Sequence, residues 1–377
     1  MSEHSSESVF MYFPTNRGWS HQLIRIIGES ANGGGDFGEI NRAASKMTVG
    51  DPESWFKEWY TIGLYVEKLA KTAEKISFIE SAQQAYFRSS NYYRMADFYL
   101  DRNDKREKPT YRKHVQNFAK AASLASRIKP VSIPFEGKKL HAYFVSSSPD
   151  TKKMPCIVIF GGADATCEEV YFNSAVDCIK RGMHALIIDG PGQGYTLRFE
   201  KLYARYDYEK VVAAAIDFLE KTYFKTVDSK RIAIMGRSLG GYYSSRAASM
   251  EKRVRAAVVF DAIFNVREDV YDFFPPVKRA INWDIGAKDD EDAIEKLKKF
   301  DLSGVAEKMR CPVLIVHGTE DYVSSPKAAE KLYKAIGSKD KMLKWYKAGH
   351  GASAYRAEST SYVFDWLYSK LTRESQD

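Results

Sequence analysis

Cysteine is scarce in this sequence, which has 4 cysteines among 377 residues. Cys156, Cys167, Cys178 and Cys311 lie in strand-like or helix-like segments, and their spacing matches no metal-binding motif. These features argue against a disulfide scaffold and against a structural zinc site. We expect four reduced, mostly buried thiols and no bound metal ion.

Long apolar runs are missing as well. No stretch of eighteen apolar residues occurs, so neither a membrane-spanning helix nor a membrane partner is expected. The opening MSEHSSESVF has no basic stretch followed by an apolar one, which argues against a secretory signal. Together these absences predict a cytoplasmic protein.

The net charge of +8 is not concentrated in one stretch. Lysines recur over residues 296–299 and 327–339 in the pattern of amphipathic helices with solvated faces. A nucleic-acid-binding protein would show a basic stripe or a recognisable module. No nucleic-acid partner is therefore expected, and the 44% hydrophobic content is that of an ordinary globular protein.

Residues 1–130 are predicted to form a helical N-terminal domain. Residues 1–40 look irregular, with a flexible run of three glycines at 33–35. Asp51 followed by Pro52 indicates the start of a helix, with the aspartate as N-cap and proline in the first turn. Two more helices are expected, one through residues 76–87 and one over about 115–128.

From residue 131 to residue 377 the pattern is that of a second domain. Residues 131–135 and 140–145 predict a hairpin. Short runs that are apolar on both faces follow and alternate with helical segments, which predicts a doubly wound, mostly parallel α/β sheet. The alternation stops between about 263 and 305, where we expect a lid inserted over the carboxyl ends of the strands. The apolar runs are residues 156–160, 185–188, 232–235, 256–260 and 313–316.

The strongest motif is Gly-Arg-Ser-Leu-Gly-Gly at residues 236–241. It follows an apolar run and precedes a predicted helix, so Ser238 would lie on a tight strand-to-helix turn that exposes its hydroxyl. The N–H of Leu239 would lie at the N-terminus of the helix, where it can stabilise an oxyanion. Ser238 is therefore the candidate nucleophile.

A serine nucleophile needs a base, and the base needs an acid that orients it. When the serine lies on such a turn, the acid and then the histidine follow it along the chain. Asp321 follows a late apolar run, and His350 lies on a glycine-flanked loop after the last strand-like segment. We predict Asp321 as acid and His350 as base, with Glu320 and Asp261 as alternatives for the acid. His317 lies within a strand and is expected to be structural.

The second oxyanion donor is expected on the loop Gly161-Gly162-Ala163-Asp164, which follows a strand. Glycines there allow a backbone N–H to point at a substrate oxygen. We nominate the N–H of Ala163, with Gly162 as the near alternative, and we place Asp164 in the substrate pocket. A further loop, Asp-Gly-Pro-Gly-Gln-Gly at 189–194, lacks the lysine of a phosphate-binding loop and is expected to be a rigid turn near the pocket.

The motifs at 161–164, 189–194 and 236–241 together resemble those of a branch of the α/β-hydrolases with a helical N-terminal domain. This branch includes the bacterial dihydroxypseudooxynicotine hydrolase, the fermentation/respiration-switch esterase-like proteins, and polyketide-shortening enzymes of fungal melanin and bacterial anthraquinone pathways. The resemblance covers residues 131–377, and residues 40–130 as a helical region in the right place. It implies an α/β-hydrolase fold with a helical N-terminal cap.

Several members of this branch hydrolyse a carbon–carbon bond next to a ketone, a retro-Claisen reaction, without a metal or organic cofactor. The resemblance implies the same activity here, on a small aromatic or polyketide-derived ketone of secondary metabolism. A carboxylesterase or an acyltransferase with the same triad is the alternative. A non-catalytic ligand-binding protein would be expected to lack one of the triad residues. All three candidates are present in this sequence. A homodimer is one candidate for the oligomeric state.

In the nicotine-pathway member, a carboxylate after the strand that follows the nucleophile helix is a proposed proton donor. Glu268 and Asp269 lie at a similar distance here, and the alternative is that both are solvated carboxylates of the lid. The N-terminal domain is rich in aromatic residues, which form either its core or a pocket wall for a flat substrate. We favour the pocket because an added domain usually borders the site. The candidate aromatic residues are Trp55, Trp59, Tyr92, Tyr93 and Phe98.

Overall fold

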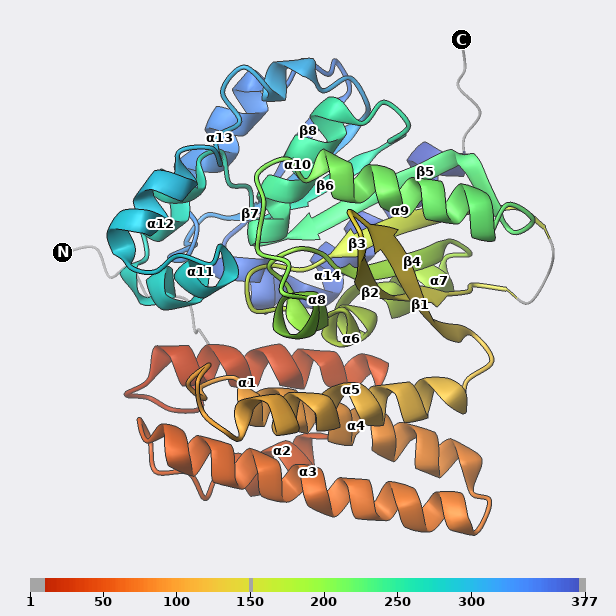
Figure 1. Cartoon of the computed structure of the whole chain (residues 1–377), viewed down its shortest axis with the longest axis vertical. Helices are drawn as coiled ribbons and strands as arrows, with labels where there is room; N and C mark the ends of the chain where they lie inside the picture. The colour runs from red at the N-terminus through yellow and green to blue at the C-terminus, as the bar shows by residue number, and fades with distance from the viewer. Residues whose placement is uncertain (1–10, 149–151, 373–377) are drawn as a thin grey trace. The chain divides into compact units, whose positions relative to one another are not determined.

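The computed structural model describes residues 11–148 and 152–372, and the chain forms two compact units. The first ends at Ser126 and is helical, and the second starts at Arg127 and is built on a β-sheet (Figure 1). The predicted domain boundary at residue 130 lies inside the first strand, β1 (Ile128–Phe135).

In the described part of the first unit, five α-helices alternate with short turns. The longest, α3, packs against α4, and α4 packs against α5. Asp51 caps α3 as predicted, because its side chain accepts the N–H of Glu53 at 3.0 Å and Pro52 is the first helical residue. The third predicted helix, α5, begins earlier than expected. The helices are α1 (Arg17–Glu29), α2 (Phe37–Ala44), α3 (Pro52–Lys75), α4 (Ile79–Asp97) and α5 (Glu107–Ser123).

The prediction that residues 1–40 are irregular is wrong for the described part of that stretch, which contains α1 and the start of α2. Asn16 caps α1 by accepting the N–H of Trp19 at 3.0 Å. Trp19, Leu23 and Ile26 recur at helical spacing and are buried. Gly33 has φ +87°, so the glycine run ends this helical segment instead of forming a long loop.

The second unit contains an eight-stranded sheet in the described residues, in the order β1-β2-β4-β3-β5-β6-β7-β8. The pairs from β4 to β8 are parallel, and β2 pairs with β1 and β4 in antiparallel fashion. The predicted doubly wound, mostly parallel sheet is confirmed. The remaining strands are β2 (Lys138–Val145), β3 (Met154–Phe160), β4 (His184–Asp189), β5 (Val227–Arg237), β6 (Ala257–Phe260), β7 (Val313–Gly318) and β8 (Lys341–Tyr346).

The predicted hairpin is formed by β1 and β2, which meet at Glu136 and Gly137. Both turn residues have positive φ, +47° and +77°, as a two-residue turn matched to the twist of the strands requires. The sheet is covered by helices that follow its strands (Figure 1). These are α6 (Cys167–Val170), α7 (Val176–Lys180), α8 (Gly194–Glu200), α9 (Glu209–Thr222), α10 (Leu239–Met250), α13 (Pro326–Ala335) and α14 (Arg356–Thr372).

The predicted insertion lies between β6 and β7. It contains a π-helical turn (Arg267–Tyr271), α11 (Lys278–Asp284) and α12 (Asp290–Leu297). An isolated bridge between Asn265 and Asp301 joins its two ends. Among the described residues, no helix combines the length and the apolar character that crossing a membrane requires.

Candidate active site

Ser238 lies at the turn between β5 and α10, as predicted. Its φ is +57°, a left-handed conformation that a residue with a side chain keeps only where its surroundings enforce it. The turn is tight, because a Cβ atom on Gly240 would lie 2.6 Å from the carbonyl oxygen of Gly161. The strained turn leaves the Ser238 side chain half-buried, at the carboxyl ends of the parallel strands.

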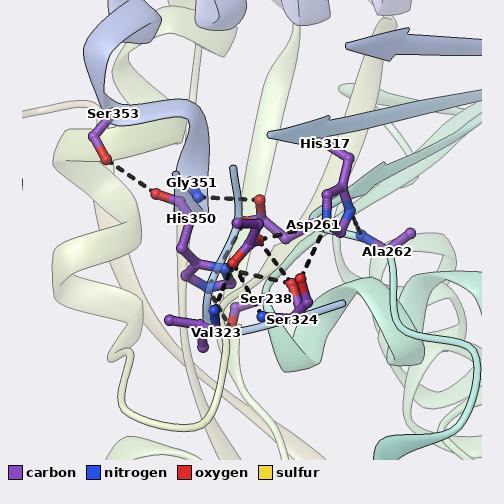
Figure 2. Close-up of polar contacts among 10 residues, drawn as sticks. Ser238, Asp261, Ala262, His317, Val323, Ser324, His350, Gly351 and Ser353 are labelled. Atoms are coloured by element: carbon purple, nitrogen blue, oxygen red, sulfur yellow. Dashed lines mark hydrogen bonds and ion pairs between the residues drawn. The ribbon is translucent and has the colours of Figure 1, made fainter. Parts of the chain in front are cut away.

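One hydrogen bond joins Ser238 to His350 (Figure 2), and a second joins His350 to Asp321, so the three side chains form a row. Nε2 of His350 lies 3.0 Å from Oγ of Ser238, and Nδ1 lies 2.8 Å from Oδ2 of Asp321. With the Nδ1 proton held by the carboxylate, Nε2 is the nitrogen that can take the hydroxyl proton. The structure therefore brings the three predicted residues together, whereas Glu320 is exposed to solvent.

Asp321 is held in place by its own loop. Its Oδ1 accepts the N–H groups of Val323 at 2.8 Å and Ser324 at 3.0 Å, and its Oδ2 accepts the hydroxyl of Ser324 at 2.8 Å. Burial by itself would raise the pKa of Asp321, but the charge and hydrogen bond of His350 outweigh it and lower this pKa to about 2. The carboxylate is thus oriented and ionised at neutral pH.

Two residues that the sequence did not assign to this row lie beside it. Asp261, considered only as an alternative acid, is buried, and its Oδ1 accepts the N–H of Gly351 at 3.0 Å. Its Oδ2 lies 3.9 Å from Nε2 of His350. Nε2 of His317, expected to be structural, lies 3.5 Å from Oδ2 of Asp321. The available signal was position, since both residues end strands adjacent to each other in a parallel sheet.

Electrostatics at His350 favour the protonated ring. Burial by itself would lower the pKa of His350, but the negative charges of Asp321 and Asp261 outweigh this effect and raise the pKa to about 9. The exposed carboxylate of Asp164 contributes in the same direction. His350 would have to lose this proton before it could act as a base.

The loop Gly161-Gly162-Ala163 passes directly beside Ser238. A Cβ atom on Gly162 would lie 2.7 Å from Cβ and 3.1 Å from Oγ of Ser238. The N–H of Leu239 belongs to the first turn of α10, where N–H groups have no partner within the helix. The candidate oxyanion donors therefore lie on the two segments that flank the hydroxyl.

Gln193 holds this loop from the rigid turn at 189–194. Its Nε2 donates to the carbonyl oxygens of Gly161 at 2.6 Å and Gly162 at 3.2 Å. Its Oε1 accepts the N–H of Gly190 and the hydroxyl of Tyr208, both at 3.0 Å. The side chain is buried, and two of its four hydrogen bonds hold the loop beside the nucleophile while the other two hold the side chain itself. The sequence placed the turn near the pocket but did not identify this contact.

The two candidate proton donors belong to the inserted segment. The side chain of Glu268 is 66% exposed, and its Oε2 lies 4.0 Å from Nζ of Lys331. Oδ2 of Asp269 accepts the N–H groups of Phe264 at 2.9 Å and Asn265 at 2.8 Å. The structure thus ties Asp269 to its own turn and leaves Glu268 at the surface. Their role as proton donors stays a prediction.

The candidate pocket aromatics lie in the helical unit. The rings of Trp55 and Trp59 are 5.9 Å apart, and Nε1 of Trp55 donates to the carbonyl oxygen of Met95. Trp55, Trp59, Tyr92 and Tyr93 are fully buried, whereas Phe98 is partly buried. These side chains make contacts inside the helical unit and belong to its core. Their role in a substrate pocket stays a prediction.

Within the described residues, two groups of side chains have donor atoms close enough to share a metal ion. One group is Asp261, Asp321 and His350. The two ring nitrogens of His350 already contact Asp321 and Ser238. The other is His141, Cys167 and Glu168, in which His141 Nε2 and Glu168 Oε1 are 2.9 Å apart. In both groups the atoms that could bind a metal ion already have partners within the protein. The proposed mechanism involves no metal ion at either group.

A mostly parallel sheet with a serine after β5, an aspartate after β7 and a histidine after β8 defines an α/β-hydrolase. Residues 170–374 match the model of the prolyl oligopeptidase family (Peptidase_S9). The chain belongs to this family.

Curated relatives and a solved structure agree with this assignment. The hydrolyase poxO of Penicillium oxalicum is 29% identical over 360 residues, covering 82% of this chain and 85% of the relative. The 20-hydroxy-prefusarin hydrolase FUS2 of Gibberella moniliformis is 28% identical over 403 residues, covering 93% and 96%. The crystal structure of 2,6-dihydroxy-pseudo-oxynicotine hydrolase aligns with a TM-score of 0.81 at 23% identity, covering 92% of this chain and 96% of that one. That structure shows the shared fold.

Proposed function

We propose that this protein is a serine-nucleophile hydrolase that cleaves a carbon–carbon bond beta to a carbonyl group in a small aromatic or polyketide-derived ketone. The observation that carries the proposal is the hydrogen-bonded row from Asp321 through His350 to Ser238, with distances of 2.8 and 3.0 Å. The named activities of two similar proteins, on 20-hydroxy-prefusarin and on 2,6-dihydroxy-pseudo-oxynicotine, support the substrate class.

The first half of the reaction forms a tetrahedral intermediate bonded to Ser238. Oγ of Ser238 attacks the ketone carbon while its proton passes to Nε2 of His350. The carbonyl oxygen becomes an oxyanion, which the N–H groups of Leu239 and Ala163 bind. Asp321 accepts the Nδ1–H bond throughout and stabilises the imidazolium.

The second half releases both fragments. The carbonyl re-forms, the carbon–carbon bond breaks, and its electron pair moves onto the departing fragment as an enolate stabilised by that fragment's own carbonyl. Nε2–H of His350 delivers the proton to the enolate carbon. Water, deprotonated by His350, then attacks the ester on Ser238, a carboxylic acid leaves, and the serine regains its proton.

The test compares an aryl β-diketone with an aryl ester that carries the same acyl group, using the full chain and mass spectrometry of the products. We expect the diketone to yield a carboxylic acid and a ketone, with one ¹⁸O incorporated into the acid in labelled water. Ser238→Ala is the matched control and should give neither product. Cleavage of the ester with the diketone left intact would overturn the carbon–carbon proposal in favour of an esterase.

A further inference from the structure

Asp261 stands out as a buried carboxylate with an enforced geometry. It follows β6 directly, with φ +63°, a left-handed conformation that aspartate tolerates better than most residues. Its backbone N–H donates to the carbonyl oxygen of Val316 at 2.8 Å, and the N–H of Ala262 donates to Nδ1 of His317 at 2.9 Å. Residues of the neighbouring strand β7 therefore bind the N–H groups of both Asp261 and Ala262. These contacts give the carboxylate of Asp261 a defined position.

The carboxylate points at the loop that carries His350 (Figure 2). Oδ1 accepts the N–H of Gly351 at 3.0 Å, and Oδ2 lies 3.9 Å from Nε2 of His350. Asp321 binds the other ring nitrogen, Nδ1. The imidazole thus has a carboxylate on each side, and the second one lies at the nitrogen that exchanges protons with Ser238.

The charged groups nearest His350 are the carboxyl groups of Asp321 and Asp261. Burial raises the pKa of Asp261, and the charge of His350 acts in the opposite direction and favours the ionised carboxylate. Asp321 and Ser238 contact its two nitrogens, and Asp261 lies beside Nε2. An opposite charge within about 4–6 Å favours the charged form of a titratable group. The polar and charged side chains that face His350 or its carboxylate partners are Asp321, Asp261, Asp164, Ser238, Ser324, His317 and, acting on Asp261, Arg237.

We propose that Asp261 is a positioning residue for proton transfer: it anchors the His350 loop through Gly351 and stabilises the imidazolium from the Nε2 side. The inference rests on the proposed function, in which the imidazolium forms when Ser238 loses its proton and lasts until the leaving carbon takes it. The imidazolium must persist until it protonates a carbon atom. A second carboxylate stabilises the imidazolium during that time. No atom of Asp261 bonds to the substrate in this scheme.

The test is Asp261→Asn, which keeps an acceptor for the N–H of Gly351 but removes the charge. The pKa of His350 is read by NMR titration of ¹³Cε1-labelled histidine, with His350→Gln identifying the resonance among 7 histidines. Losing a nearby negative charge destabilises the imidazolium, so this pKa should fall by about 1 unit or more. The acid limb of the kcat/KM profile should move to lower pH by the same amount, while kcat falls about tenfold and KM stays constant.

The control is Asp301→Asn, the same chemical change at the far end of the inserted segment that follows Asp261. Asp301 accepts the side-chain N–H of Asn265 at 2.8 Å and the N–H of Ser303 at 2.7 Å. This variant should lower the melting temperature without moving the titration of His350. If both variants shifted the titration equally, the effect would be structural and the proposal would fail.

Two results would overturn the inference. One is an unchanged pKa of His350 in a folded Asp261→Asn protein. The other is a wild-type pKa of His350 at its ordinary value of about 6.5, which decides the matter even if the variant does not fold. Because the titration needs no substrate, a wild-type protein that cleaves no ketone would refute the proposed function separately.

Discussion

The two units treat buried polar side chains in opposite ways. In the helical unit, polar groups pair with one another across helices deep in the interior. Asn91 donates to Glu29 at 2.6 Å, and Arg94 donates to Asn91 at 2.7 Å. The hydroxyl of Tyr93 donates to Glu67 at 2.5 Å. These networks run through the core of the unit.

In the α/β unit, the central strands are apolar on both faces, and polar side chains gather where the strands end. Ser238, Asp261 and Asp321 follow β5, β6 and β7, three neighbours in the sheet. His350 follows β8 and reaches all three. The hydrogen bonds between strands already satisfy the backbone of the buried strands. Few polar side chains are therefore needed before the carboxyl ends of the strands.

The difference separates structural from chemical polar groups. A buried charge is costly unless it is paired, and the buried Glu29 is paired with Arg94 at 3.5 Å. At the edge of the sheet, the hydroxyl of Ser238 is instead held half-exposed beside a base. A strained, partly open arrangement of this kind is what a reaction requires.

The largest expected effect is on turnover. Ser238→Ala should lower turnover by at least about 10³-fold with the melting temperature unchanged, because it removes the covalent route. His350→Ala should be comparably damaging, and the double variant should be no worse than either single one, because the two residues act as a unit. Steady-state kinetics with thermal melts would measure this, and near-normal activity in His350→Ala would contradict the assignment of the base.

The next largest effect concerns stability in the helical unit. Arg94→Ala should destabilise the protein by about 3–5 kcal/mol, because it leaves Glu29 as an uncompensated buried charge. Lys120, whose pair with Glu74 is exposed, is the control, and Lys120→Ala should cost at most about 1 kcal/mol. Urea unfolding of the full chain measures both values. Equal costs at the two sites would remove the distinction between buried networks and surface pairs.

The smallest expected effect tests whether a polar group at the sheet edge acts through the loop it holds. Gln193→Met should lower kcat by about 10- to 100-fold. This is less than the effect of removing an oxyanion donor, because the loop at 161–163 would shift but its N–H groups would remain. Stability should fall by about 1–3 kcal/mol, because buried backbone groups lose their partners. Tyr208→Phe removes one of the four hydrogen bonds and is the control. A stability loss with kcat unchanged would make Gln193 structural only.

Much of the α/β unit could be predicted because its signals are local. Apolar runs of strand length, glycines around Ser238 and the order of acid and histidine are all visible in short windows. The helix α1 was missed although it has 13 residues and Trp19, Leu23 and Ile26 recur in it at helical spacing. The start of α5 was also placed too late, since polar residues fill its first turn.

The site was predictable in its members and not in its arrangement. The sequence predicted Asp321 as the acid with Asp261 as an alternative, whereas the structure places Asp321 at Nδ1 of His350 and Asp261 beside Nε2. The contact from Gln193 to the oxyanion loop likewise joins residues about thirty positions apart. No local pattern encodes such pairs.

The sequence by itself therefore determined the fold class and the strand and helix order of the second unit, and it predicted Ser238, Asp321 and His350 as a set, which the structure brings together. These features depend on side-chain periodicity and on the backbone freedom of glycine at one tight turn, both of which act over a few residues. Only the tertiary structure decided the strand order, the carboxylates on the two sides of His350 and the partners of the buried charges. Those depend on contacts such as that between Ser238 and His350, 112 positions apart, and such distances are set by packing across the sheet.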